Sequence, residues 1–398
     1  MASFFGFVKR VKTAINPPKC EPAADSAPIK FGILGAANIA PNALILPARC
    51  HPEAEIYAVA ARSLEKAQAF AAKHEIPKAY GGPNAYQELL DDPQVVAVYN
   101  PLPNGLHYEW TMKALNAGKH VLLEKPSADT STETREMFEY AEKKGLILLE
   151  AFHYRFHPAV QRAKAILDSG ELGAVKHIEA RMSIFRGFMK DDDIRFDYDL
   201  GGGAMMDMGC YTMNCIRYMT SAEPVTVTSA KPSTFVSKTR SASNVDEGMT
   251  AEVTFPNDTT GTVFCHLRNP PSFWFIPKMP EFFLSMKCEG GELKMNNFVM
   301  PTLYHYIEVN VKTGRDGKGR KTRVEKVYKP TEAGAKGEEW WTTYRYQLEA
   351  FVDKLKGRTP QTWVTAEDSV ANMQGIEKVY EKSGLGIRPA STFKLLEG

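Results

Sequence analysis

Short apolar runs alternate with amphipathic segments of helical period from residue 29 to about residue 155. The runs are almost continuously apolar, which is typical of strands buried on both faces of a parallel sheet, and each connector is long enough for one crossover helix. Ser63 is a predicted N-cap, and Gly145 is predicted to end a helix. The predicted strands are 29–34, 55–61, 95–100, 120–124 and 146–152.

A different pattern follows residue 173, where polar and apolar residues alternate between turn residues. Such alternation predicts an antiparallel sheet with one exposed face. The predicted strands are 174–185, 224–236, 248–256, 259–267, 291–297 and 323–330, and helical patterns over 344–358 and 365–384 close the chain. We therefore predict an arm and linker over 1–27, a first domain over 28–153 and a second α/β domain with a large open, mostly antiparallel sheet over 154–398.

The run VKTGRDGKGRKTR at 311–323 contains six basic residues and one acidic residue. It could form a phosphate-binding patch. Its glycines and its place among predicted strands favour a solvated hairpin tip instead.

The charge of the chain is unevenly distributed. With 49 basic and 47 acidic side chains the net charge is +2, but the first twenty residues hold four basic residues, Lys9, Arg10, Lys12 and Lys19, and no acidic one. The rest of the chain has 45 basic and 47 acidic side chains. A nearly neutral body argues against nucleic-acid binding, which needs a basic face. For the arm we favour packing against the body or a partner subunit over organelle targeting or contact with a membrane surface.

The six cysteines include no CxxC pair, so neither a disulfide framework nor a cysteine zinc site is predicted. No apolar run of eighteen residues and no secretory leader pattern occurs, so we expect a soluble cytoplasmic protein with no integral membrane segment.

A tight turn follows the first predicted strand in IKFGILGAANIA. In GxGxxG register the turn carries Gly35, Ala37 and Ala40, and small residues at these places let backbone amides approach a pyrophosphate at a helix N-terminus. The predicted contacts of a dinucleotide with this turn are Gly35, Ala36, Ala37, Asn38 and Ile39.

The second strand ends in Arg62 and Ser63, where an NAD-binding protein would carry an acidic residue. A guanidinium and a hydroxyl suit the 2′-phosphate of NADP, so NADP is favoured over NAD. In an alternative interpretation, Arg62 only stacks on the adenine and either cofactor is accepted.

The next two strands are followed by the segments NPLPNGLH and EKPSA, at the edge of the sheet where open α/β sheets bind ligands. Lys125 is a candidate acid, base or substrate clamp, although a lone lysine is usually solvated. Further predicted cofactor contacts are Asn100, Pro101, Leu102, Asn104, His107, Glu124, Lys125 and Pro126.

Several of these segments together resemble the glucose–fructose oxidoreductase, inositol dehydrogenase and rhizopine catabolism (Gfo/Idh/MocA) family, close to its dimeric dihydrodiol dehydrogenase and NADP-dependent D-xylose 1-dehydrogenase branch. The resemblance runs from about residue 29 to 217. It implies an N-terminal Rossmann domain, a C-terminal α/β domain that binds a sugar or diol and often a second subunit, and catalytic roles for Lys125, Asp207 and Tyr211. The segments are GILGAANIA, NPLPNGLHYEW, GKHVLLEKP, LLEAFHYRFHP and LGGGAMMDMGCY.

Asp207 and Tyr211 are four residues apart and are expected to share one face of a helix. We predict that Lys125 lowers the pKa of Tyr211 so that the phenolate accepts the proton of the substrate hydroxyl, or that the two residues exchange roles. Asp207 would accept hydrogen bonds from sugar hydroxyls. The alternative is purely structural, with Asp207 as a helix cap and Tyr211 in the core.

His153 and His157 have the spacing of a metal pair, but hydride transfer needs no metal and none is predicted. Tyr154 and Arg155 are expected to line the cofactor and substrate cleft. Arg195 is expected either to reach the sugar or to pair with Asp191–Asp193.

Together with the resemblance, these residues predict an NADP-dependent oxidoreductase of a sugar or cyclic diol. The favoured reaction is oxidation of an aldose such as D-xylose at the anomeric hydroxyl to a lactone. The rival hypotheses are a reductase of a dicarbonyl or keto-sugar and a non-catalytic NADP-binding regulator.

Overall fold

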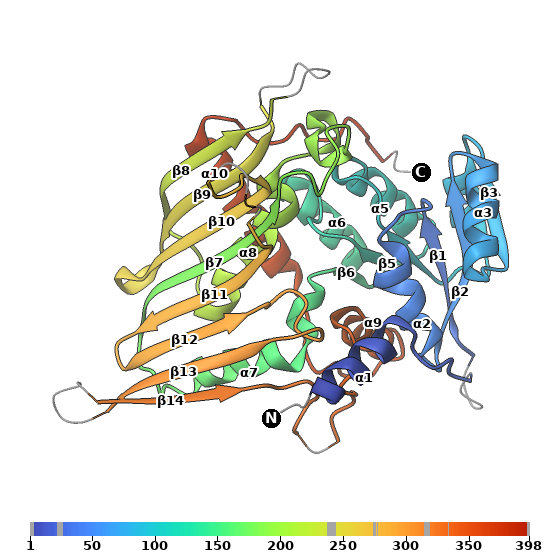
Figure 1. The fold of residues 1–398 in the computed structure, drawn as a ribbon. Coiled ribbons are helices and arrows are strands. Elements are labelled where there is room, and N and C mark those ends of the chain that lie inside the picture. The colour runs from blue at the N-terminus through green and yellow to red at the C-terminus, as the bar shows by residue number, and fades with distance from the viewer. Residues whose placement is uncertain are drawn as a thin grey trace.

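The first half of the chain forms a fully parallel sheet with the strand order β3-β2-β1-β4-β5-β6 (Figure 1). The computed structural model describes residues 4–21, 27–236, 244–273, 276, 278–313, 319–332 and 334–395. The strands are β1 (Ile29–Leu34), β2 (Ala54–Ala61), β3 (Lys78–Gly81), β4 (Ala97–Asn100), β5 (His120–Leu123) and β6 (Leu148–Glu150). The predicted Rossmann sheet is confirmed, and its order reverses between β1 and β4, where ligands bind in such sheets.

The edge strand β3 was not predicted because its four residues are exposed or half-buried and form no apolar run. Ser63 caps α3 as predicted, since its Oγ accepts a hydrogen bond from the backbone N–H of Lys66 at 3.3 Å. The helices between these strands are α2 (Leu46–Arg49), α3 (Leu64–His74), α4 (Ala85–Asp91), α5 (His107–Asn116) and α6 (Ser131–Lys143).

The two faces of the parallel sheet pack into different cores. On one face Phe31 meets Phe351 of α9 (Thr343–Leu355), with ring centroids 6.1 Å apart. On the other face Leu34 packs with Leu89 of α4. A large apolar side chain that is fully buried stabilises the fold by about 1.5–3 kcal/mol. A helix from the C-terminal part of the chain thus completes a core of the first sheet.

The second half of the chain forms a large sheet with the order β14-β13-β12-β11-β7-β10-β9-β8. All neighbours are antiparallel except β7 and β10, so the predicted open, mostly antiparallel sheet is confirmed. The strands are β7 (Val175–Phe185), β8 (Thr226–Thr234), β9 (Asp246–Thr254), β10 (Thr260–Asn269), β11 (Glu281–Cys288), β12 (Gly291–Asn296), β13 (Tyr306–Thr313) and β14 (Gly319–Glu325).

Three details of this sheet differ from the predictions. Strands β11 and β13 were not predicted, and β14 lies at 319–325 instead of 323–330. Strands β13 and β14 pair as the hairpin expected for the basic run, whose tip at 314–318 lies outside the described residues.

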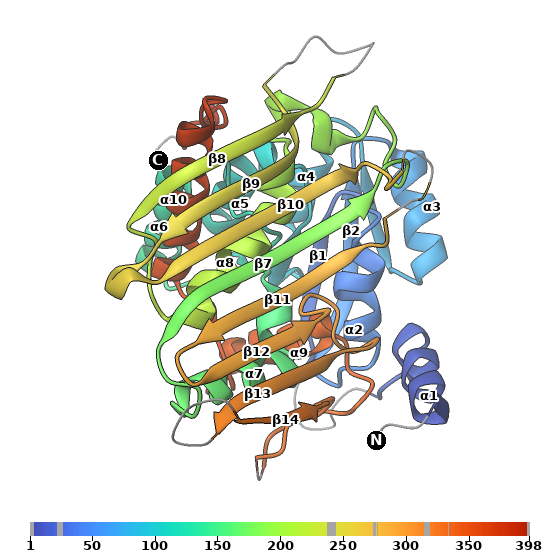
Figure 2. The same cartoon turned by 60° about the vertical axis from the view of Figure 1, so that its left-hand side comes forward.

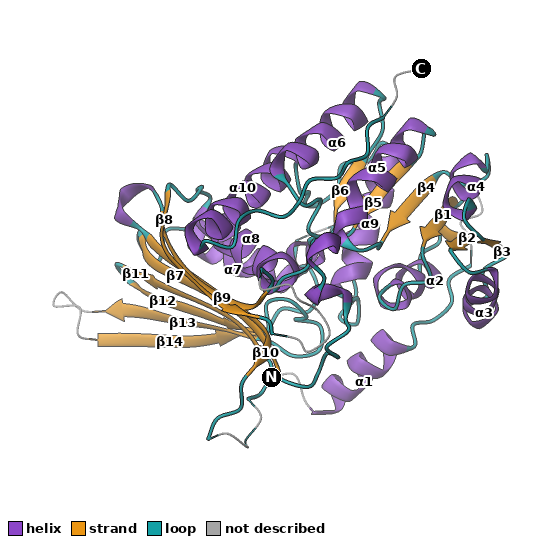
Figure 3. Ribbon diagram, turned by 90° about the horizontal axis from the view of Figure 1, so that it is seen from above, coloured by secondary structure: helices purple, strands orange, loops and turns teal. Residues whose placement is uncertain are grey.

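Helices lie against one face of the large sheet and separate it from the parallel sheet (Figure 3). They include α7 (Pro158–Asp168), α8 (Cys210–Thr220) and α10 (Ala366–Ser383). Figure 2 shows the opposite face, which no described helix of the chain covers. The predicted boundary at 153/154 falls between β6 and β7. The end of the chain returns to the first sheet, since the backbone N–H of Ser391 donates to Glu133 Oε1 at 2.6 Å.

The N-terminal arm begins with a helix, α1 (Phe4–Ile15), anchored by Arg10. The Arg10 side chain is buried, donates to the carbonyl of Thr302 at 2.8 Å and lies 3.5 Å from the ring centroid of Tyr328. The arm therefore packs against the body, as the sequence favoured; residues 22–26 of its linker lie outside the described part. Among the described residues, no helix has both the length and the apolar character to cross a membrane.

Candidate active site

The turn after β1 exposes backbone at the carboxyl edge of the parallel sheet. Gly35 has φ +88°, a conformation that favours glycine, and its N–H donates to the carbonyl of Ala60 at 2.7 Å. Asn38 and Ile39 are exposed, whereas Ala40 is buried at the start of the following helix. Among the described residues, no acceptor binds the amide groups of 36–39. Four free N–H groups at a helix N-terminus fit a pyrophosphate.

Arg62 lies one residue beyond β2 and is exposed, and no described side chain pairs with its guanidinium. It is therefore available to a 2′-phosphate, as predicted from the sequence. Ser63 is half-buried, and its hydroxyl is already engaged as the cap of α3.

The loop after β4 is held by buried groups that the sequence predicted as cofactor contacts. Asn100 is fully buried and donates to Thr111 Oγ1 at 3.1 Å. His107 is also fully buried, with its ring nitrogens 2.8 Å from the carbonyl oxygen of Pro126 and 2.7 Å from that of Leu102. Burial lowers the pKa of His107 to about 4, so the ring is neutral. Both side chains therefore support the loop from inside, and a cofactor contact of Asn100 or His107 would have to come from the backbone.

Four other predicted cofactor contacts lie at the same carboxyl edge of the parallel sheet. Pro101 and Asn104 are half-buried, and Asn104 Nδ2 donates to the carbonyl of Gly201 at 3.0 Å, which joins the loop to the second domain. Leu102 is buried next to the Gly35 turn. Pro126 is buried beside Lys125, and the peptide bond between them is cis.

Lys125 leaves the end of β5 and meets Asp207 from the second domain. Its Nζ lies 2.8 Å from the backbone oxygen of Asp207 and 3.0 Å from Asp207 Oδ1. The other carboxylate oxygen, Oδ2, lies 3.0 Å from Arg195 Nε. Arg195 Nη1 also pairs with Asp193 at 3.1 Å, which is one of the two alternatives expected for this arginine; its contact with a sugar stays a prediction. The three charged groups lie at the junction of the two domains.

Asp207 belongs to a π-helical turn, Met205–Gly209, that precedes α8, so the prediction of one regular α-helix is corrected. Tyr211 lies in the first turn of α8, and its ring centroid is 4.9 Å from Lys125 Nζ. Single π turns inside helices occur often at functional sites. The wider turn still brings both Asp207 and Tyr211 close to the same ammonium group.

The charges of this cluster keep Lys125 and Asp207 ionised. Burial alone would raise the Asp207 pKa, but Arg195 and Lys125 outweigh it and hold the pKa well below its usual range. Burial alone would lower the Lys125 pKa, but Asp207, together with Cys210 and Glu124, outweighs it and the pKa is raised. Lys125 is therefore a cation at neutral pH.

The predicted pKa of Tyr211 is wrong in direction. Burial, together with nearby Tyr344 and Glu124, raises the Tyr211 pKa well above its usual range. The Lys125 ammonium binds Asp207 and not the phenol oxygen, which lies 2.9 Å from His153 Nε2. The phenol is thus protonated in this structure. The sequence showed the two residue types but not which anion the lysine would meet.

The residues that surround Tyr211 and Lys125 come from distant segments. Glu124 is buried and accepts a hydrogen bond from the Tyr99 hydroxyl at 2.6 Å. His153 Nδ1 lies 2.8 Å from Thr343 Oγ1 of α9, and Tyr344 stacks on the same imidazole with ring centroids 4.0 Å apart. No sequence signal pointed to Tyr99, Thr343 or Tyr344, because their partners are distant in sequence: 25 positions separate Tyr99 from Glu124, and 190 separate Thr343 from His153.

Tyr154 and Arg155, which were expected to line the cleft, have buried side chains, although the Tyr154 ring packs against Tyr211 with centroids 5.9 Å apart. Tyr154 is fully buried, and its hydroxyl donates to Asn214 Oδ1 at 2.7 Å. Arg155 pairs with Asp368 of α10 and stacks on Tyr218. Both side chains belong to the core beneath the large sheet. His153 and His157 do not form a pair, and within the described residues no group of three metal-ligating side chains comes together.

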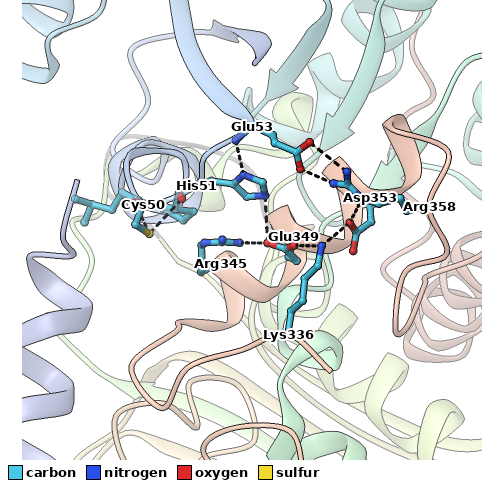
Figure 4. A network of polar contacts seen from close by, with 10 residues as sticks. Cys50, His51, Glu53, Lys336, Arg345, Glu349, Asp353 and Arg358 are labelled. Atoms are coloured by element: carbon cyan, nitrogen blue, oxygen red, sulfur yellow. Dashed lines mark hydrogen bonds and ion pairs between the residues drawn. The ribbon is translucent and has the colours of Figure 1, made fainter. Parts of the chain in front are cut away.

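The described cavity, of about 140 Å³, lies elsewhere, between α9 and the segments 334–336 and 359–362. Its carboxylates are paired: Lys336 Nζ lies 2.7 Å from Glu349 and 3.0 Å from Asp353. Figure 4 shows that the same network continues to His51 at the entry to β2. We interpret this network as a link between α9 and the first sheet. We assign the chemistry to the Lys125 cluster, which consists of Lys125, Asp207, Arg195 and Tyr211 and shares its edge of the parallel sheet with the free amide groups of 36–39.

The comparisons with known proteins agree with this geometry. A family model described as an oxidoreductase family with an NAD-binding Rossmann fold matches residues 29–152, and a GFO/IDH/MocA C-terminal domain model matches residues 160–282. The chain is similar to D-xylose 1-dehydrogenase (NADP(+)) 2 of Haloferax volcanii, with 35% identity over 89% of this chain and 98% of that protein.

Two further similarities cover related chemistry. A trans-1,2-dihydrobenzene-1,2-diol dehydrogenase of Xenopus tropicalis is 35% identical over 48% of this chain and 56% of its own length. A crystal structure of a 3-ketoreductase from Actinomadura kijaniata, in complex with NADP and TDP-benzene, has 26% identity and a TM-score of 0.72 over 89% of this chain and 98% of that chain.

One buried carboxyl of this region is not used by the cluster. Asp129 is 5% exposed, and its Oδ1 has no hydrogen-bond partner among the described residues. The oxygen lies against Gly201, where any Cβ would collide with it. Burial, and then the neighbouring Glu133, raise the pKa of Asp129 to about 8. The carboxyl is therefore neutral at pH 7.

Asp129→Asn should reduce the pH dependence of stability between about pH 4 and 8. A carboxyl whose folded pKa is raised stabilises the fold fully below its unfolded pKa, and this contribution declines as pH rises to the folded value. Urea unfolding is measured at successive pH values. As the pH rises through this range, the free energy of unfolding of the variant should increase relative to that of wild type by about 1.4 kcal/mol per pH unit. Asp91→Asn at an exposed carboxyl is the control. A difference that is constant with pH would contradict the assignment.

Proposed function

The chain belongs to the Gfo/Idh/MocA family of NAD(P)-dependent oxidoreductases, and we propose that it oxidises a D-xylose-like aldose at the anomeric hydroxyl to a lactone with NADP. The observation that carries the proposal is the Lys125–Asp207 pair beside Tyr211, at the sheet edge where free amide groups and Arg62 can hold a dinucleotide phosphate. The similarity to a D-xylose dehydrogenase over nearly its whole length supports the substrate class.

The protein's part of the reaction is to place the cofactor and the substrate. NADP supplies the hydride acceptor. The amides of 36–39 would bind its pyrophosphate, and Arg62 would bind its 2′-phosphate. Asn38 and Ile39 are the most exposed residues of that turn, so cofactor would cover them.

The substrate oxygen would lie between Lys125 and Tyr211. Bound NADP would accept the hydride from the anomeric carbon, and the hydroxyl proton would pass to Tyr211 or Lys125, whichever had first released its own proton to solvent, so that a lactone remains. The Lys125 ammonium holds the oxygen, and Asp207, with lone pairs left beyond its two ion pairs, accepts a hydrogen bond from a neighbouring hydroxyl.

A second candidate is reduction of a keto-sugar or dicarbonyl. Both Lys125 and Tyr211 hold their protons in this structure, because the pKa of each is raised. A protonated pair is ready to donate to a carbonyl oxygen that receives hydride, whereas oxidation needs one of the two to lose its proton first. We therefore expect oxidation to accelerate with rising pH and reduction to proceed at neutral pH.

Lys125→Met should lower kcat/KM by roughly a hundredfold to ten-thousandfold, because it removes the cation at the reacting oxygen. Purified protein is assayed with NADP and pentoses, hexoses and trans-dihydrodiols, and with NADPH and keto-sugars, by the absorbance of the reduced cofactor. Lys382→Met, at an exposed lysine in the last turn of α10, is the control. Full activity of Lys125→Met would rule out the catalytic role. If wild type neither oxidises any of the sugars and diols nor reduces any of the keto-sugars, the proposed function is ruled out.

Arg62→Ala should raise the KM for NADP about tenfold or more and leave the KM for NAD nearly unchanged, because only NADP carries the phosphate that the guanidinium would bind. Lys73→Ala, at an exposed lysine near the end of α3, is the matched control for lost positive charge. Equal effects on both cofactors would mean that Arg62 acts on the adenine and not on the phosphate.

We also propose that two chains pair through the uncovered face of the large sheet. In the paired registers of β10, β7 and β11, Phe264, Arg181 and Phe283 lie side by side on that face, and Arg181 stacks over Phe264 at 4.1 Å. Glu179 lies in the adjacent row of β7, so the face carries charges of both signs beside aromatic rings. Such a face can match a copy of itself about a twofold axis.

Phe283→Glu should convert a dimer to a monomer, because the charge would be buried between two copies of the face. Sedimentation velocity of the full chain measures this directly. Phe188→Glu introduces the same charge at a residue that is 61% exposed outside this sheet face and should leave the sedimentation unchanged. A monomeric wild type would contradict the pairing.

A further inference from the structure

Tyr211 is one end of a buried hydrogen-bonded chain that crosses three elements. Its phenol oxygen lies 2.9 Å from His153 Nε2, and His153 Nδ1 lies 2.8 Å from Thr343 Oγ1. His153 and Thr343 are each 1% exposed. The imidazole is fixed between two rings, since Tyr344 stacks on it at 4.0 Å and Tyr211 meets it edge-on at 5.6 Å. The ring cannot turn without losing both hydrogen bonds.

The imidazole has one donor and one acceptor to share between its two neighbours. Burial, and then the charge of Lys125, lower the pKa of His153 to about 3, so the ring is neutral. In one arrangement Tyr211 donates to Nε2 and Nδ1–H donates to Thr343. In the other, Thr343 donates to Nδ1 and Nε2–H donates to Tyr211.

The two arrangements differ in which hydroxyl proton is left without an acceptor. Among the described residues, His153 is the hydrogen-bond partner of the Thr343 hydroxyl and of the Tyr211 hydroxyl, and neither hydroxyl has a second one. In the first arrangement the unused proton is that of Thr343, which is buried in the interior where no substrate can reach it, so the donor stays unsatisfied. In the second it is that of Tyr211, whose ring lies 4.9 Å from Lys125 Nζ, where a bound substrate oxygen would accept it.

We propose that Thr343 holds His153 in the Nε2–H form, so that His153 donates to the Tyr211 oxygen and the Tyr211 proton is left for the substrate oxygen. His153 and Thr343 are positioning residues, since neither would touch substrate. The inference rests on the proposed function for its consequence, which is that the phenol is prepared to donate to a carbonyl. The arrangement itself depends only on the fold.

Nitrogen-15 NMR of the full chain labelled at histidine tests the tautomer without any activity. The His153 signals are identified by their loss in His153→Gln. Shifts typical of a protonated Nε2 and an unprotonated Nδ1 are expected. The opposite pattern would overturn the proposal, and so would a doubly protonated ring at neutral pH.

Kinetics test the consequence in the direction of carbonyl reduction. His153→Leu and Thr343→Val should lower kcat about tenfold to a hundredfold, because the phenol loses its orientation. KM should change little, because neither residue contacts the substrate. His153→Gln can donate at the same place, and Thr343→Ser keeps the hydroxyl, so both should retain most of the activity. Thr220→Val is the control, since the half-buried Thr220 lies at the far end of α8 and its hydroxyl donates to the carbonyl of Ile216 at 2.7 Å within the same helix.

Thermal unfolding of each variant separates lost orientation from lost folding. A kcat for His153→Gln as low as that for His153→Leu, in folded protein, would overturn the positioning role. Wild type that is inactive with every sugar, diol and carbonyl would reject the proposed function, while the NMR experiment would still decide the tautomer.

Discussion

The ion pair between Lys125 and Asp207 is the interaction on which the rest of the site depends. It joins the end of β5 in the first domain to a π-helical turn in the second, at a Nζ to Oδ1 distance of 3.0 Å. Two partly buried charges are expensive to remove from water, and Arg195 on the other carboxylate oxygen helps to offset that cost. Because the pair spans both domains, the charge state of the site depends on the relative position of the two sheets.

The turn that carries Asp207 is itself positioned from far along the chain. Arg388, fully buried, donates from Nε to the carbonyl of Gly202 at 2.6 Å and pairs with Asp246 at 2.8 Å. Asp246 in turn accepts a hydrogen bond from the backbone N–H of Met205 at 2.7 Å, which satisfies a donor in the first turn of the helix. The C-terminal segment therefore contributes to the site although it lies far from the reacting groups in sequence.

Burial explains the protonation states of the side chains in the site. Tyr211, His153 and Lys125 lie within one cluster, and burial favours the uncharged form of each: it raises the pKa of the tyrosine and lowers the pKa of the imidazole and of the lysine. Only for Lys125 do nearby groups, Asp207 first among them, reverse the effect and raise the pKa. A hypothesis built on residue types alone gave Tyr211 the phenolate form, because it paired Lys125 with Tyr211, whereas in the structure the Lys125 ammonium pairs with Asp207.

The sequence by itself determined the parallel sheet, the exposed Gly35 turn, the cap at Ser63 and the identity of the residues at the strand ends. These follow from local patterns, since apolar periodicity, turn chemistry and short motifs act over a few residues. Only the tertiary structure decided which of those residues face the site. Asn100, His107 and Tyr154 turned inward, and Thr343 approached His153 across 190 positions. The direction of a side chain and the pKa of a buried group depend on neighbours that fold in from elsewhere, so no local pattern can contain them.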